Sequence, residues 1–340
     1  MPANSNKTLE SLHPGNFAMV MATGIIGIGL ANLQLDALSV FFKGFAVFGW
    51  VVLIVLSALR FARYYRAVFI DLTAPRMVFS YFTLVAATDI VGLILHGYGF
   101  IMLALACWVL AFVVWCLLLY TAFSVLTFLS HEHNVNIMHG GWLITIVGTQ
   151  SLVLLGTLIA PDLGEYAHIM MVEVHMLWGL GLSLYGIFVA LFCYRIFFLS
   201  LKPNDLSPLL WVVMGAAAIS ANAGTSLFWS DDQLPFLAAQ KPFIDGVTLM
   251  IWSWATWWIP MLFLFGIWKH VTNKVPFTYE PALWSMVFPL GMYTVASERL
   301  GQAAEFPPMI WIAQLMIWIA IAAWVLVMGG MLKQIINLRH

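Results

Sequence analysis

The sequence predicts an all-α polytopic membrane protein, and three observations support this prediction. First, 63% of the 340 residues are hydrophobic, only 9% are charged, and the mean hydropathy is +0.95. Soluble domains carry about 25% charged residues, so a chain this poor in charge belongs in a bilayer. Second, the apolar residues form runs that are long enough to cross a membrane. Third, the basic residues gather in the connections after alternate runs.

Apolar runs of roughly 18 to 25 residues predict transmembrane helices. We count ten, with limits near 15–35, 39–60, 76–96, 99–127, 137–160, 167–198, 208–229, 244–268, 281–300 and 307–332. We expect a single transmembrane domain over residues 1–340, with short tails at 1–13 and 333–340. The polar start MPANSNKTLESL lacks the apolar core of a signal peptide, so the first run is expected to remain as a helix.

Basic residues set the predicted orientation. With ten spans, both termini share a side with the connections after the even-numbered spans. Eleven of the 14 basic residues fall on that side, namely Lys7, Arg60, Arg63, Arg66, Arg76, Arg195, Lys202, Lys269, Lys274, Lys333 and Arg339. Lys43, Lys241 and Arg299 fall on the other side. The positive-inside rule therefore predicts that both termini are cytoplasmic, in an inner or plasma membrane.

Odd-numbered and even-numbered spans differ in composition. The odd spans carry the small and polar residues, as in the first run, TGIIGIG, whereas most even spans are richer in bulky apolar residues, as in CWVLAFVVWCLLLY. Small residues let helices approach closely, and bulky ones suit contact with lipid. We therefore expect an inner ring of odd helices that lines a central pore, and an outer ring of even helices.

Prolines favour a repeated hairpin. Pro14, Pro75, Pro208 and Pro281 stand at the starts of spans one, three, seven and nine, where the first helical turn accepts proline. The fifth span lacks such a proline, but a start near Asn136 fits the same interval. The spacing predicts five helical hairpins wrapped around one axis.

The ninth span, PALWSMVFPLGMYTVASER, carries the main candidate site. Pro289 lacks an N–H and its ring clashes with the carbonyl of Ser285, so we expect a helix kink there, inside protein or beside a water-filled path. A helical wheel places Trp284, Phe288, Gly291, Met292, Val295 and Arg299 on one face. Phe288 is therefore a candidate gate, and Arg299 lies about 16 Å further along the helix as a cation at the mouth.

Two stretches resemble a known family. They are His13-Pro14-Gly15-Asn16-Phe17 followed by Val20-Met21-Ala22-Thr23-Gly24, and Trp284-Ser285-Met286-Val287-Phe288-Pro289. The chain resembles the tellurite-resistance/dicarboxylate transporter family, which includes bacterial tellurite-resistance membrane proteins, fungal malate and sulfite transporters and the slow anion channels of plant guard cells. The resemblance implies a homotrimer in which each protomer holds a pore lined by five inner helices.

The resemblance also implies the gate. A phenylalanine of the ninth helix closes the pore in this family, and Phe288 occupies that motif position. Phe17 matches the aromatic residue of the first-helix motif, which also faces the pore. Family members pass malate, sulfite, chloride or nitrate, and some are known by tellurite resistance alone, so the resemblance does not select the substrate.

An anion path needs positive potential, and the odd spans carry no ring of Lys or Arg. Helix N-termini and hydroxyl or amide donors are the remaining sources. The candidate pore-lining and anion-binding residues are Thr23, Ser220, Asn222, Thr225, Ser285, Gly291, Thr294 and Arg299. The alternative for each polar residue is a hydrogen bond that packs helices. For Arg299 it is contact with lipid headgroups or pairing with Glu298.

Asp89 and His96 are candidates for proton coupling, because they share a face of the third span. A charged carboxylate at the bilayer centre costs roughly 2.5 to 3.5 kcal/mol, so such groups usually face protein or a cavity. The alternative for Asp89 is a structural pairing within the bundle.

The predicted function is transport of a small anion across the lipid bilayer through an anion channel or uniporter. The alternatives are a proton-coupled carrier of C4-dicarboxylates such as malate and an exporter of sulfite- or tellurite-type oxyanions. No nucleophile with its base, metal site or pair of haem ligands is visible in the sequence, so we expect neither enzymatic activity nor a cofactor. His131, Glu132, His133 and His139 match no standard metal spacing. A net charge of −1 argues against nucleic acid.

Overall fold

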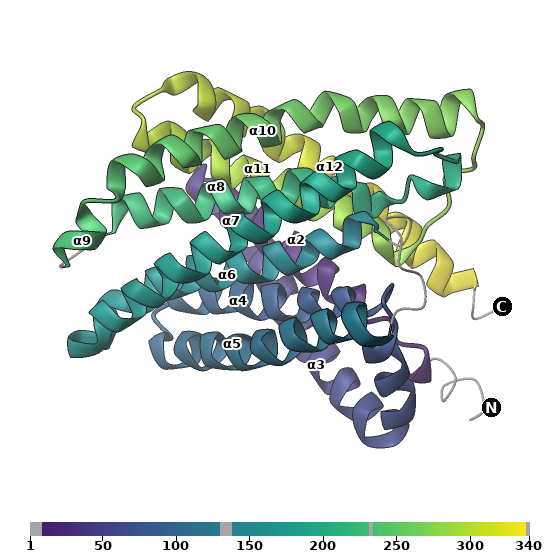
Figure 1. Cartoon of the computed structure of the whole chain (residues 1–340), viewed down its shortest axis with the longest axis horizontal. Helices are drawn as coiled ribbons and strands as arrows, with labels where there is room; N and C mark the ends of the chain where they lie inside the picture. Colours follow the sequence, from purple (N-terminus) through teal and green to yellow (C-terminus); the bar gives the residue numbers. More distant parts are fainter. Residues whose placement is uncertain (1–8, 130–137, 231–233, 338–340) are drawn as a thin grey trace.

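The protein is all-helical throughout the described part of the chain. The computed structural model describes residues 9–129, 138–230 and 234–337, and these ranges contain helices and turns but no β-strand. Their ten long helices are α2 (Phe17–Asn32), α3 (Asp36–Thr73), α4 (Phe82–Gly97), α5 (Ile101–Ser124), α6 (Ile144–Ile159), α7 (Ala167–Phe198), α8 (Val212–Trp229), α10 (Lys241–Ile267), α11 (Trp284–Ala303) and α12 (Pro307–Asn337). They form one bundle (Figure 1), which confirms the predicted fold class.

Five of these helices form a closed inner ring. α2 contacts α4, α4 contacts α6, α6 contacts α8, α8 contacts α11, and α11 returns to α2. Each outer helix packs mainly on the inner helix that precedes it, so that α3, α5, α7, α10 and α12 cover α2, α4, α6, α8 and α11 in turn. The structure therefore contains the five predicted hairpins, with odd helices inside and even helices outside.

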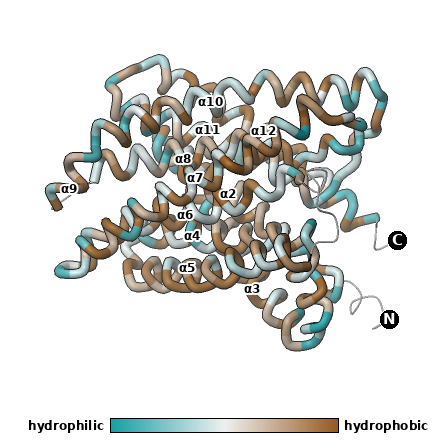
Figure 2. Tube along the Cα trace, in the orientation of Figure 1, coloured by the Kyte–Doolittle hydropathy of each residue, from teal (hydrophilic) through white to brown (hydrophobic). Residues whose placement is uncertain are grey.

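Burial explains the two kinds of helix. The inner helices are almost entirely buried, whereas the outer helices expose large apolar side chains along their length. Hydrophilic residues gather toward the two ends of the bundle (Figure 2), as expected for a protein that spans a bilayer. Eight helical segments of the described chain are long and apolar enough to span, and the segment Gly140–Phe198 among them contains both α6 and α7.

α11 is not one of these eight segments. It carries Glu298 and Arg299 along with several hydroxyl residues, and it is enclosed by α2, α8 and α12. Because its neighbours shield it from lipid, this helix tolerates a polarity that an outer helix would not.

A short 3-10 turn precedes each inner helix. These turns are η1 (Pro14–Asn16), η2 (Val78–Tyr81), η5 (Gly140–Leu143), η8 (Pro208–Trp211) and η10 (Pro281–Leu283), and they also contact one another in a closed ring. The inner helices begin at this end of the bundle, which we call the N-terminal mouth. They finish at the opposite end, which we call the C-terminal mouth. Both names refer to the inner helices and not to the termini of the chain.

Three of the four predicted first-turn prolines begin their turns. Pro14, Pro208 and Pro281 are the first residues of η1, η8 and η10. The prediction for Pro75 is wrong by three residues, because η2 begins at Val78 and Pro75 lies in the preceding connection. The predicted start near Asn136 lies outside the described residues, and η5 begins at Gly140.

The second helix is longer than predicted. α3 continues from the expected end near residue 60 to Thr73, and its backbone leaves helical values at Tyr64 (φ −133°, ψ 40°). Arg60 donates from Nη2 to Asp71 Oδ2 at 2.7 Å across this break. The extension carries charged residues, so it belongs to the end of the bundle and not to the apolar span.

Candidate functional site

A cavity of about 300 Å³ lies at the C-terminal mouth, and all five inner helices contribute to its wall. We call it the mouth cavity. Most of its lining is aliphatic, and its polar lining residues are Asn32, Lys43, Asn222 and Arg299. Because residues from the whole ring meet there, the mouth cavity lies where an axial path would open.

The charged lining of the mouth cavity is entirely positive. Lys43 and Arg299 line it, and no described Asp or Glu does. Glu298 is the neighbour of Arg299 in sequence, but it accepts hydrogen bonds from Asn32 Nδ2 at 2.8 Å and from Gln302 Nε2. This carboxylate is thus held by amides of α2 and α11. The predicted alternative, in which Glu298 pairs with Arg299, is absent among the salt bridges of the described residues.

Two neighbours in α8 hold Arg299. Its Nη1 donates to Asn222 Oδ1 at 3.2 Å, and its guanidinium lies 5.8 Å from the ring centre of Trp229. Asn222 in turn directs Nδ2 toward the sulfur of Met292 at 3.6 Å. An amide and an aromatic face orient the cation without neutralising it, since neither carries a negative charge.

Lys43 is a functional candidate that the sequence reasoning missed. It belongs to the outer helix α3, and its stem packs where a Cβ on Gly27 would lie only 2.9 Å from Lys43 Cγ. The close approach of α2 and α3 at Gly27 brings the lysine to the cavity wall, and its Nζ lies 5.8 Å from the ring centre of Tyr98. An available signal was its position inside an apolar run, since such cations usually face protein or a cavity.

Helical geometry places Phe288 of α11 between the contacts of this helix with its two neighbours in the inner ring, α8 and α2. Pro289 packs against α8, where a Cβ on Gly215 would lie 2.7 Å from the proline Cγ. On the other side, Gly291 packs against Ile25 of α2. Phe288 projects between these two contacts.

The positions of the cavity-lining residues of α11 relative to Phe288 agree with this placement of Phe288. Val295 and Arg299 line the mouth cavity and follow Phe288 by two and three full helical turns. The buried Phe288 therefore lies about 10 Å from Val295 toward the N-terminal mouth. The helix itself runs through Pro289 as one element from Trp284 to Ala303.

Phe17 is placed differently. It lines a separate cavity of about 160 Å³ together with Ser57, Arg60 and Phe61 of α3. This cavity lies on the side of α2 that the outer helix covers. The structure therefore does not bring Phe17 to the mouth cavity.

Most of the predicted hydroxyl donors bond within the bundle. The hydroxyls of Thr23, Ser220, Thr225 and Thr294 donate to backbone carbonyls four residues earlier in their own helices. Thr23 also accepts the indole N–H of Trp324 in α12 at 2.9 Å, so it faces an outer helix. None of these four lines the mouth cavity. Among the predicted polar lining residues, the structure places Asn222 and Arg299 in its wall.

Ser285 and Gly291 also lie away from the mouth cavity. Ser285 is buried in the first turn of α11, where Pro289 leaves its carbonyl without the usual backbone donor. Gly291 forms the close contact with α2 described above. Both residues therefore shape the helix and its packing.

Asp89 and His96 are not brought together. Asp89 is fully buried between α4 and α6, where it accepts the Ser151 hydroxyl at 2.6 Å, and its Oδ1 has no hydrogen-bond partner among the described residues. His96 Nε2 instead lies 2.7 Å from Asp162 Oδ2 in the connection after α6. Each has its own partner, and neither lines the mouth cavity.

The histidine cluster considered for metal binding is only partly described. His131, Glu132 and His133 lie outside the described residues, and the described ranges contain no group of three or more metal-ligating side chains. His139 accepts the N–H of Gly141 through Nδ1 at 3.1 Å and so caps η5.

A closed ring of membrane helices around a cation-lined cavity defines an integral membrane protein of the channel or transporter class. The family model described as voltage-dependent anion channel matches residues 11–332, and the chain belongs to this family. The match covers nearly the whole chain and confirms the family resemblance seen in the sequence.

Relatives of the chain agree with this assignment. An uncharacterized membrane protein of Mycobacterium tuberculosis is 40% identical over 141 residues, covering 42% of this chain and 71% of the relative. Two uncharacterized transporters of Methanocaldococcus jannaschii are each 24% identical, one over 93% of this chain and 91% of its own length, the other over 91% and 90%. The protein is therefore a multi-pass membrane protein, and channels and transporters of this kind are not enzymes.

Proposed function

We propose that this protein conducts small anions through the centre of the five-helix ring and that Phe288 closes the path. The main support for this proposal is the mouth cavity, because its charged lining consists of Lys43 and Arg299 without a carboxylate among the described residues. Such a wall attracts anions and repels cations. Membership of the anion channel family and the transporter names of the archaeal relatives support the same function.

The proposed path has two steps. An anion enters the mouth cavity and exchanges part of its hydration shell for the side-chain amides of Asn32 and Asn222 and the guanidinium of Arg299. It then meets Phe288, whose ring offers no replacement for water and keeps a narrow passage dry. Conduction requires the ring of Phe288 to move aside. By the distribution of basic residues, the C-terminal mouth faces the outside of the cell.

Planar-bilayer currents test this proposal. We compare the wild type with Phe288→Ala in chloride, nitrate and malate, each at two pH gradients. Phe41→Ala is the matched control, because Phe41 is an exposed aromatic residue of the outer helix α3. We expect a much larger anion current in Phe288→Ala alone, and a reversal potential that follows the anion gradient at either pH gradient.

A different result supports a carrier. If Phe288→Ala carries no more current than wild type, while malate uptake into vesicles follows an imposed proton gradient, the channel proposal fails. Asp89 and His96 then become the residues to change. A native oxyanion such as sulfite is distinguished by adding it to the same series.

A further inference from the structure

A second and larger cavity adjoins the mouth cavity. It measures about 530 Å³ and lies between α6, the turn Ala160–Tyr166, α7, α8 and the short helix α9 (Pro235–Ala238). We call it the side cavity. The two cavities share Leu93, Leu154, Leu158 and Arg299 in their walls. Arg299 therefore stands at their junction and is accessible from both.

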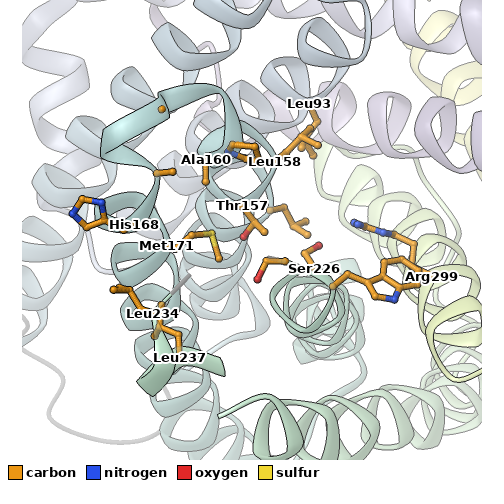
Figure 3. Close-up of a pocket in the computed structure, with 16 residues that line it drawn as sticks. Leu93, Thr157, Leu158, Ala160, His168, Met171, Ser226, Leu234, Leu237 and Arg299 are labelled. Atoms are coloured by element: carbon orange, nitrogen blue, oxygen red, sulfur yellow. The ribbon is translucent and has the colours of Figure 1, made fainter. Parts of the chain in front are cut away.

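The polar groups of the side cavity are unevenly distributed. Figure 3 shows Arg299 at one end and His168 on the opposite side, with Met171 between them. The hydroxyls of Thr157 and Ser226 donate to the carbonyls of Val153 and Asn222, so their protons are already used within the helices. Arg299 is thus the strong donor at its end of the cavity, and no Asp or Glu is among the described lining residues.

Most of the remaining wall is apolar, although Ser230 also contributes to it. Met171, Leu234 and Leu237 line the part of the cavity that lies away from Arg299, and His168 lies on the same side. The volume falls within the roughly 300 to 1,000 Å³ typical of small-molecule sites, and it far exceeds the need of a halide or nitrate. A ligand that fills it has one anionic end and an apolar body.

We propose that the side cavity binds organic monocarboxylates with an aromatic or short aliphatic body. The carboxylate pairs with the guanidinium of Arg299, where two N–H groups match two oxygens. The apolar body packs on Met171, Leu234 and Leu237. Because Arg299 also lines the mouth cavity, a bound monocarboxylate competes there with small anions and lowers their current.

Calorimetric titration of the purified chain in lipid nanodiscs with sodium benzoate tests the site directly. We expect saturable benzoate binding, no binding of the neutral analogue benzamide, and affinity weaker by about tenfold or more in Arg299→Gln. Met171→Trp and Leu234→Trp fill the cavity from two different sides and are expected to abolish binding. Met176→Trp is the matched control, because Met176 lies on α7 but is exposed on the outer surface.

Three results would overturn the inference. They are wild-type binding that equals background, equal binding of benzamide and benzoate, and benzoate affinity that is unchanged in both cavity-filling variants. Size-exclusion profiles identify any variant that fails to fold, and two independent filling variants keep the test decisive.

The block of anion current is a second readout and rests on the proposed function. We expect benzoate to reduce the chloride current of wild type and of Met176→Trp, and to have less effect on Met171→Trp. If wild type carries no chloride current but benzoate binds to the variants as expected, the proposed function is contradicted, and the proposal of a monocarboxylate site in the side cavity is retained. If current flows normally and benzoate does not bind, only the side cavity fails.

Discussion

Substitution of Arg299 is the most direct test of the electrostatic effect of the mouth cavity. Its guanidinium is held by Asn222 and Trp229, and the neighbouring Glu298, which attracts it electrostatically, forms no salt bridge with it and is held by Asn32 and Gln302 instead. Replacement by Gln removes one of two lining cations. We expect the anion conductance at about 0.05 M salt to fall roughly three- to tenfold, and the effect to shrink near 1 M salt, where the Debye length is about 3 Å.

The matched control is Arg299→Lys, which keeps the charge but loses the planar donor array. Single-channel conductance measured over a salt series distinguishes the effect of the charge from the effect of the hydrogen bond. Loss in the Lys variant equal to that in the Gln variant would show that the hydrogen bond to Asn222, and not the charge, matters. Lys43→Gln should behave as Arg299→Gln does, because both residues line the same cavity.

His13 and His139 form a related pair at the N-terminal mouth. Each precedes a 3-10 turn and accepts, through Nδ1, the N–H of the residue two positions on, Gly15 or Gly141. Burial lowers the pKa of His139 to about 4, and the charges of Arg195 and Arg76 add to this effect. Burial also lowers the pKa of His13, with Arg60 acting in the same direction and Asp71 opposing.

These lowered pKa values predict acid sensitivity. The unfolded chain binds a proton at His139 near pH 6.5, whereas the folded chain binds it only near pH 4. The folded state is therefore fully favoured above about pH 6.5 and loses stability as the pH falls toward 4. For His139 alone the loss between pH 7 and pH 5 is about 2 kcal/mol.

Thermal melting in detergent at pH 7 and pH 5 measures this loss. His139→Asn keeps a side-chain acceptor for the cap but does not titrate, so the Tm of this variant should depend less on pH than that of wild type. The double variant His13→Asn/His139→Asn should show a smaller pH dependence again. His168→Asn, which changes a histidine of the side cavity, should retain the wild-type dependence. Equal pH dependence in all variants would assign the effect to other groups.

At the scale of the elements, α11 is positioned by two glycine contacts. Gly215 of α8 receives the ring of Pro289, and Gly291 receives Ile25 of α2. A Cβ at Gly215 would lie 2.7 Å from Pro289 Cγ and 3.3 Å from its Cα. The proline ring cannot rotate away, so accommodation requires α8 and α11 to separate.

Gly215→Ala should therefore destabilise the ring and disturb the gate. We expect a loss of about 1–3 kcal/mol, seen as a lower Tm in detergent, together with a higher basal anion current as α11 shifts. Gly246→Ala in α10 is the control, because a Cβ added there would meet no neighbouring group within 4 Å and alanine favours a helix. A Gly215→Ala protein as stable as wild type would mean that the helices adjust without cost.

The sequence predicts these elements well because a bilayer restricts the possible structures. Each long apolar run must satisfy its own backbone groups, so a run of sufficient length becomes a helix. The α3 extension was missed because Arg63, Arg66 and Asp71 interrupt its apolar residues and so mark the end of a predicted span. Pro75 was misplaced because a proline before a turn gives the same sequence signal as a proline within it.

The site was harder to predict than the elements. Thr23 and Asn222 are both polar residues of inner helices, yet one faces Trp324 and the other faces the cavity. Helical periodicity locates a face, but only the positions of the neighbouring helices decide whether that face meets the axis or an outer helix. Lys43 was missed for the same reason, since its role depends on how closely α3 approaches α2.

On the scale of the whole molecule, the bundle has two unlike ends. α2 begins and α12 ends at the same end (Figure 1), where the five 3-10 turns also meet. The C-terminal mouth holds the mouth cavity and the side cavity. The homotrimer implied by the family resemblance remains a prediction about assembly, which native mass spectrometry of the purified protein measures directly.

The uneven distribution of basic residues also predicts how the molecule is oriented in the membrane. Of the 12 basic residues that the structure describes, nine lie on the side of the N-terminal mouth, so that end should face the cytoplasm. Ser200 and Ala37 are small, exposed residues at the two opposite ends. In a background in which Cys107, Cys116 and Cys193 are replaced, we expect an impermeant maleimide to label Ala37→Cys in intact cells and Ser200→Cys only after permeabilisation.

Labelling of both variants after permeabilisation is the control for reactivity of the two thiols. The reverse pattern would place the mouth cavity, with Lys43 and Arg299, in the cytoplasm. The cation-lined end would then collect anions for export under a negative membrane potential, whereas the predicted orientation presents it to anions outside the cell. The same two variants therefore decide from which compartment the proposed side-cavity ligands reach Arg299.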